Sequence, residues 1–168
     1  MKLADLNVLD EAAFVAALGG VFEHSPWVAR RAHASRPFAG VDALHEAMLA
    51  VVRAATYDEQ LALIRAHPEL AGRAMIANAL TLDSASEQSG AGLTRCSPDE
   101  YAALVDLNAR YNAKFGFPFI LAVKGYDRAG VIAEFARRVG RDVHSEFVEA
   151  LAQIARITGF RLSALVER

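Results

Sequence analysis

Residues 44–52 read Leu-His-Glu-Ala-Met-Leu-Ala-Val-Val, and this stretch decides the fold class. Its apolar residues recur at the spacing of one helix face: Leu44, Met48, Val51 and Val52. Similar stripes follow over residues 131–139 and 147–154. Since 168 residues suffice to bury one core, the sequence predicts an all-α, single-domain helical bundle over residues 1–168.

Local signals mark where these helices begin and end. Two pairs match the capping box of a helix start: Thr56 with Glu59, and Ser97 with Glu100. Three glycine sites predict helix ends, because glycine readily adopts the left-handed conformation after a last turn: Gly19-Gly20, Gly116 and Gly140.

Two stretches interrupt the helical pattern. Residues 81–94 are rich in Ser and Gly, and residues 115–125 are mostly apolar. The Phe117-Pro118 step favours an extended backbone, so one short extended apolar segment is predicted near 117–123. Its buried amides need partners, and we expect some of them to remain available to a ligand.

Composition excludes several classes of partner. The net charge is −2 and no basic stripe is present, which argues against nucleic acid. The longest apolar run, Phe117–Val123, is too short to cross a bilayer, so no membrane partner is expected. Asp5 and Asp10 stand where an export signal would need apolar residues, and Cys96 is the only cysteine. These features predict a reduced, cytoplasmic location.

His67 is the first candidate for chemistry. It follows the predicted helix 57–66 and precedes Pro68, whose ring disfavours helix at His67. The negative end of a helix dipole favours the charged form of a histidine, which suits a proton donor. The alternative is a histidine that only caps the helix or lies at the surface.

The second candidate is the run Ser84-Ala85-Ser86-Glu87-Gln88. Ser84 and Glu87 have capping-box spacing, so one interpretation is purely structural. The other is that Glu87 and Gln88 project from a helix start into a pocket.

No other constellation carries a chemical signal. The remaining histidines lack ligand spacing, and His45-Glu46 lacks the second histidine of a zinc-protease pattern, since Leu49 stands there. No CxxC, P-loop or GxGxxG pattern is present, so neither a metal nor a cofactor is predicted. Cys96 is interpreted as a packing residue.

Three separated motifs occur together, in this order: His67-Pro68-Glu69-Leu70-Ala71-Gly72; Ser84-x-x-Glu87-Gln88-x-x-Ala91-Gly92-Leu93; and Leu107-Asn108-x-x-Tyr111-x-x-Lys114-Phe115-Gly116-Phe117-Pro118-Phe119-Ile120. Together they resemble the OHCU decarboxylases, which convert 2-oxo-4-hydroxy-4-carboxy-5-ureidoimidazoline to (S)-allantoin and carbon dioxide. The similarity covers nearly the whole chain. Glu69 departs from the aspartate that is commoner in the family.

The resemblance implies an all-α fold, no cofactor, a small-molecule substrate and a homodimer. It implies that His67 and Glu87 are catalytic. It further implies contacts with the substrate from these residues: Pro68, Ser84, Ala85, Ser86, Glu87, Gln88, Phe119, Ile120, Leu121, Ala122, Val123 and Arg161. Two alternatives stay open at this point: a non-catalytic helical interaction domain with His67 and Glu87 far apart, and a relative that acts on another ureido acid.

Overall fold

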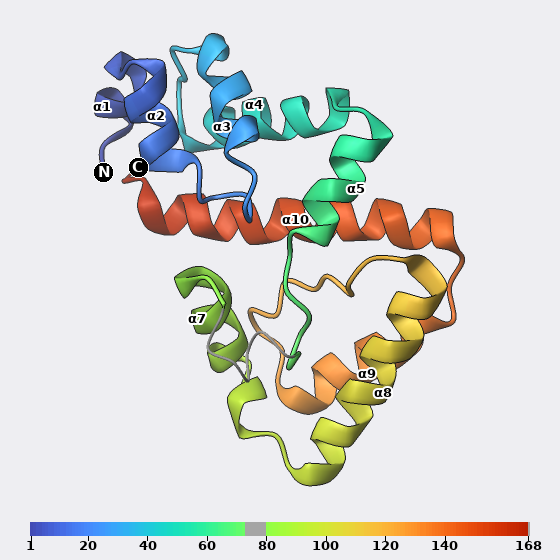
Figure 1. The fold of residues 1–168 in the computed structure, drawn as a ribbon. Coiled ribbons are helices and arrows are strands. Elements are labelled where there is room, and N and C mark those ends of the chain that lie inside the picture. Colours follow the sequence, from blue (N-terminus) through green and yellow to red (C-terminus); the bar gives the residue numbers. More distant parts are fainter. Residues whose placement is uncertain (73–79, 168) are drawn as a thin grey trace. The chain divides into compact units, whose positions relative to one another are not determined.

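The computed structural model describes residues 1–72 and 80–167, and these residues form nine α-helices and no β-strand (Figure 1). The all-α prediction is therefore confirmed. The contacts of the chain divide it into two compact units: unit 1 is Met1–Ala66 with Ile154–Arg168, and unit 2 is His67–Gln153. That residues 1–168 form a single domain stays a prediction.

Unit 1 contains five helices and the second part of a sixth: α1 (Leu3–Val8), α2 (Glu11–Leu18), α3 (Pro26–Ala32), α4 (Val41–Ala54), α5 (Tyr57–Arg65) and α10 (Val143–Leu165). A short 3-10 turn, His33–Ser35, follows α3. The stripe of α4 packs as the sequence predicts, since Leu44 and Met48 are fully buried and Val52 nearly so. The apolar stripe of α4 thus contributes to the core of this unit.

Unit 2 contains α7 (Leu82–Gly90), α8 (Pro98–Phe115), α9 (Arg128–Val139) and the first part of α10. Its core is aromatic. The Phe119 and Phe135 rings stack with their centroids 3.9 Å apart, and Tyr111 meets both rings edge-on. Val131 and Phe135, from the predicted stripe of α9, are fully buried.

Most helix boundaries confirm the local predictions. Both capping boxes are present, at the starts of α5 and α8. Gly116 ends α8 in the left-handed conformation, with φ of 73°. Gly19 and Gly140 end their helices with φ of −62° and −75°, so the left-handed prediction is wrong at both. The Gly19 amide still bonds to Val15 as a continuing helix would, so the chain leaves the helix from a right-handed residue.

The two interruptions differ in outcome. Residues 81–94, predicted to break the helical pattern, contain α7 and the 3-10 turn Leu93–Arg95, so that prediction is wrong. Residues 117–123 form neither helix nor strand and are buried throughout, as predicted. Among the described residues, no helix is long and apolar enough to cross a membrane.

Candidate functional site

The residues around His67 form the first part of the site. Helix α5 ends at Arg65 with Ala66 as its cap, and the chain after it is not helical, as the His67-Pro68 step predicts. His67 is only 7% exposed, so it is no surface histidine. Ala71, four residues on, has φ of 50°, a conformation that costs energy for any residue with a Cβ. Other groups must therefore hold this backbone in place.

Side-chain carboxamides from two helices hold it. Gln88 of α7 accepts a hydrogen bond from the Ala71 amide at 2.9 Å and donates one to the Glu69 carbonyl at 3.2 Å. Asn108 of α8 donates to the Leu70 carbonyl at 2.9 Å. We call these two side chains the amide clamp. It fixes the backbone of residues 69–71, three consecutive residues of the motif that begins with His67.

The start of α7 differs from the predicted capping box. The N-cap is Thr81, whose hydroxyl accepts from the Ser84 amide at 3.3 Å. Ser84 is therefore the third helical residue and Glu87 lies a turn further on, so the Ser84–Glu87 capping box is wrong. Ser84 and Gln88, four residues apart, form the buried face of α7, at 4% and 2% exposed.

The other residues of this run have different surroundings. Ala85 and Ser86 are exposed and Glu87 is half-buried. The structural interpretation of Glu87 as a cap no longer applies, because the helix begins five residues before it. The catalytic role of Glu87 stays a prediction.

The apolar segment 119–123 forms the third part of the site. The fully buried Arg138 donates from Nη1 to the Ile120 carbonyl at 2.8 Å. The side chain of Gln153 accepts from the Ala122 amide at 2.9 Å. Because residues two apart in an extended chain direct their main-chain groups to the same side, one edge of the segment is fixed. The main-chain groups of Leu121, the residue between these two, then face the opposite edge, and its amide forms no hydrogen bond within the described part of unit 2.

A buried polar network holds Arg138 itself. Its Nη2 lies 2.8 Å from Oε2 of Glu146, and both side chains are completely buried. Tyr111 donates to the same oxygen at 2.5 Å. Burial, together with the hydrogen bond to Glu146, raises the pKa of Tyr111 well above its usual range, so the phenol stays a donor. The Arg138 guanidinium also lies over the Phe119 ring, 4.4 Å from its centroid.

Arg161, the last predicted contact, lies in unit 1. There its Nη1 is 2.8 Å from the Glu23 carboxylate and 3.4 Å from the Val21 carbonyl. Both members of this ion pair are buried. The role of Arg161 as a substrate contact stays a prediction.

The structure thus brings most predicted residues into one unit. His67, Pro68, the run 84–88 and the segment 119–123 all belong to unit 2. Gln88 joins the second motif to the first, and Asn108 joins the third to the first. This arrangement disfavours an interaction domain whose polar loops only cap helices.

Sequence reasoning missed the residues that hold segment 119–123: Arg138, Glu146 and Gln153. One signal was available. Arg138 stands seven residues after Val131, on the apolar stripe of α9, where a charged residue must find a buried partner. The partners of Arg138 carry no comparable signal.

Other chemistry finds little support. Within residues 1–72 and 80–167, no group of three His, Cys, Asp or Glu side chains could hold a metal ion. Burial raises the pKa of the Cys96 thiol, which donates to the Leu93 carbonyl at 3.2 Å. A protonated thiol with this partner fits packing better than nucleophilic catalysis.

Fold and site together define a protein that is all-α in its described residues and that carries a buried histidine and a half-buried carboxylate in one compact unit, with a main-chain amide that has no hydrogen bond to any described residue. The model of the family described as OHCU decarboxylase matches residues 7–163. The chain belongs to this family, which confirms the resemblance found in its motifs.

Named relatives agree with the family match. The chain is 41% identical to the 2-oxo-4-hydroxy-4-carboxy-5-ureidoimidazoline decarboxylase of Haloferax volcanii, with 97% of this chain and 95% of the relative covered. It is 40% identical to the uric acid degradation bifunctional protein PucL of Bacillus subtilis, over 96% of this chain and 32% of that longer protein. A solved structure of (S)-allantoin synthase matches with a TM-score of 0.78 and 29% identity, covering 99% of this chain and 54% of the other.

Proposed function

We propose that this chain decarboxylates 2-oxo-4-hydroxy-4-carboxy-5-ureidoimidazoline to (S)-allantoin in urate degradation. The observation that carries the proposal is the family match over residues 7–163, together with a relative of that name covered over 95% of its length. The joining of the three motifs within unit 2 supports it, because His67 and Glu87, the two residues with proposed catalytic roles, then belong to one compact body.

The reaction breaks the bond between the ring carbon and the carboxylate. Carbon dioxide leaves and the electron pair passes into the conjugated C=N bond of the ring, which gives an enolate-like ring anion. The hydroxyl on the decarboxylated carbon loses its proton and becomes the ring carbonyl of allantoin, and a proton is added to the neighbouring ring carbon, which carries the ureido group. Because the substrate supplies its own electron sink, we propose that no cofactor takes part. The protein then orients the carboxylate, stabilises the ring anion and delivers the proton to one face.

We assign the role of proton donor to His67 and the role of its catalytic partner to Glu87. A buried histidine next to a strained backbone suits this task, because its position is fixed before the substrate arrives. Glu87 either orients the imidazole or accepts the proton of the substrate hydroxyl. Within this proposal Gln88 acts mainly through its two hydrogen bonds to residues 69–71, which occupy its amide.

The remaining predicted residues bind the substrate. The main chain of 119–123 offers the Leu121 amide, a fitting donor to a carbonyl or carboxylate oxygen. Pro68 and Ser84 would form walls of the pocket beside His67 and Glu87, with Ala85 and Ser86 at its rim. Arg161 would neutralise the substrate carboxylate.

The test is turnover of freshly prepared substrate, followed by the circular dichroism of the (S)-allantoin formed. We expect the wild type to exceed the spontaneous rate and to give one enantiomer. We expect His67→Asn to return the reaction to the spontaneous rate, and the matched variant His144→Asn, at an exposed histidine, to retain full activity. A racemic product at an accelerated rate would contradict protonation by the enzyme. If the wild type does not exceed the spontaneous rate of decarboxylation, the proposed substrate is wrong, and another ureido acid becomes the candidate.

We further propose that the protein is a cytoplasmic homodimer. Family resemblance is the support for the dimer, and the single cysteine is the support for the reducing compartment. Light scattering on a size-exclusion column should give about twice the chain mass of 18.1 kDa. A single-chain mass at micromolar concentration would contradict the dimer.

A further inference from the structure

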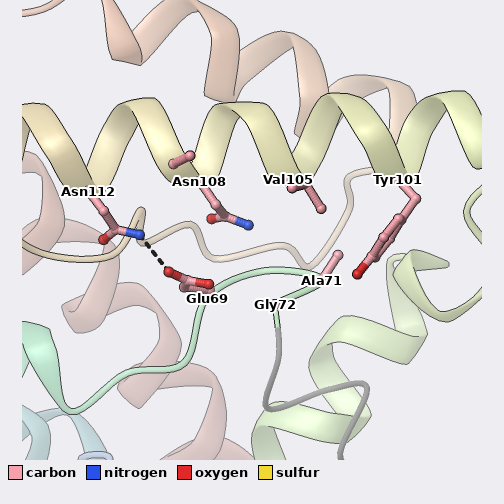
Figure 2. Close-up of a pocket in the computed structure, with 8 residues that line it drawn as sticks. Glu69, Ala71, Gly72, Tyr101, Val105, Asn108 and Asn112 are labelled. Carbon is pink, nitrogen blue, oxygen red and sulfur yellow. Dashed lines mark hydrogen bonds between the residues drawn. The ribbon is translucent and has the colours of Figure 1, made fainter.

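A cavity of about 360 Å³ lies on unit 2, between one face of α8 and residues 69–72 (Figure 2). Its lining includes Tyr101, Val105, Asn108 and Asn112 of α8, with Glu69 and Gly72 opposite. This volume is typical of sites for small organic molecules. None of the residues to which we assign a catalytic or substrate-binding role lines it, so the cavity is separate from the proposed active site.

One wall of the cavity presents an unsatisfied acceptor. Asn108 is 6% exposed, and its Nδ2 donates to the Leu70 carbonyl. Because a carbonyl can only accept, this bond fixes the orientation of the carboxamide and determines which atom is the oxygen. The remaining atom, Oδ1, is buried and has no hydrogen-bond partner among the described residues. A buried acceptor of this kind calls for a donor, and the cavity is where a donor can come from.

The neighbouring wall carries a negative charge. Glu69 lies next to Asn108, and its Oε1 accepts a hydrogen bond from Asn112 at 2.5 Å (Figure 2). That bond holds the carboxylate at the cavity, and no lysine or arginine is among the lining residues that the structure describes. A group with several N–H donors and a positive charge therefore matches this end of the cavity, whereas an anion is disfavoured.

The other end of the cavity is apolar and aromatic. Val105 and the Tyr101 ring lie further along the same face of α8 (Figure 2). At a rise of 1.5 Å per residue, the eleven steps from Tyr101 to Asn112 span about 16 Å. The cavity is thus elongated, with polar acceptors at one end and a flat ring at the other.

We propose that this cavity binds small organic cations that carry an amidinium or guanidinium head on a flat apolar body. The planar head donates to Asn108 Oδ1 and to the Glu69 carboxylate, and the body packs on Val105 and Tyr101. Planar groups with paired N–H donors suit a carboxylate beside a carbonyl oxygen better than a spherical ammonium does. Such a ligand touches the same backbone that the amide clamp holds.

The test uses three probes of one shape and different charge: benzamidinium, benzamide and benzoate. Binding is measured on the isotope-labelled full chain from chemical shifts of the Asn108 and Asn112 side-chain amides and the Gly72 backbone amide. We expect benzamidinium to bind about five- to tenfold more tightly than benzamide, since a charge-assisted hydrogen bond replaces a neutral one, and benzoate to leave these signals unchanged.

Two variants assign the binding to this cavity. Glu69→Gln keeps an acceptor for Asn112 and removes the charge, so it should abolish the preference for benzamidinium over benzamide. The control Asp106→Asn removes a carboxylate from the same helix outside the cavity and should change nothing. Val105→Trp, at a half-exposed position that tolerates a larger side chain, should fill the cavity and weaken both probes.

Three results would each overturn the proposal. The first is the absence of shifts at Asn108, Asn112 and Gly72 with any probe. The second is equal affinity for benzoate and benzamidinium. The third is an unchanged benzamidinium preference in a folded Glu69→Gln protein. None of these results bears on the decarboxylation, because binding and not turnover is measured.

Discussion

Replacing Gln88 with Leu should reduce the free energy of unfolding by about 1–3 kcal/mol. Leu is close to Gln in size but leaves the Ala71 amide without a partner, and it removes one of the two hydrogen bonds that the Glu69 carbonyl accepts, the other coming from the Gly72 amide at 3.4 Å. A buried group deprived of its partner costs about 1–3 kcal/mol, and Gln88 is only 2% exposed, so solvent cannot replace it easily. The strained backbone of Ala71 would also lose the bond that holds it.

The assay is urea unfolding followed by circular dichroism, with hydrogen exchange at the Ala71 amide as a local probe. The matched control is Ser89→Ala, the adjacent and exposed residue of α7, which should stay within about 0.5 kcal/mol of the wild type. Both measurements are made without substrate, so a contact with substrate cannot contribute. A loss below about 1 kcal/mol with unchanged exchange at Ala71 would refute the amide clamp and leave Gln88 to the substrate alone.

Three further predictions follow from the same structure. Thr81→Ala should cost about 0.5–2 kcal/mol in urea unfolding because Thr81 is the N-cap of α7, and a loss near zero would contradict that assignment. Glu87→Gln should stay within about 0.5 kcal/mol of wild-type stability yet lower turnover by several orders of magnitude, since an amide cannot exchange a proton as a carboxylate does; equal turnover would remove Glu87 from the mechanism. Arg138→Met should cost up to about 3 kcal/mol because it leaves the buried Glu146 with the partly exposed Arg141 as its remaining cationic partner, and adding Glu146→Leu should recover part of the loss; a double variant less stable than the single one would argue against a poorly compensated charge as the cause.

The helical fold was predictable because its signals are local. Apolar spacing in α4 and α9 and the capping boxes of α5 and α8 need only residues within a few positions of one another. The same reasoning failed for α7, where Ser and Gly have low helical propensity. There the buried side chains of Ser84 and Gln88 give the helix a face that packs, and tertiary contacts outweigh propensity.

The motifs name the members of the candidate site, and these stay predictions; the way in which the site is built could not be predicted from the sequence. The motifs identified His67 and Gln88, yet nothing in the sequence shows that Ala71 adopts a left-handed conformation, since it is no glycine. The course of the backbone through residues 69–71 depends on that conformation. The hydrogen bonds from Gln88 and Asn108 to this backbone depend on its course in turn. Arg138 was detectable as a charge on an apolar stripe, but its bond to Ile120 joins residues that no periodicity relates.

The amide clamp has a consequence for how activity depends on pH. Carboxamides neither gain nor lose protons in the aqueous range, so Gln88 and Asn108 hold residues 69–71 equally well in acid and in base. A bell-shaped rate profile recorded on the folded protein therefore reports ionisation of the substrate or of the groups that react with it, and not loosening of residues 69–71. Titration of this enzyme can thus be interpreted as chemistry over the whole interval in which the helices persist.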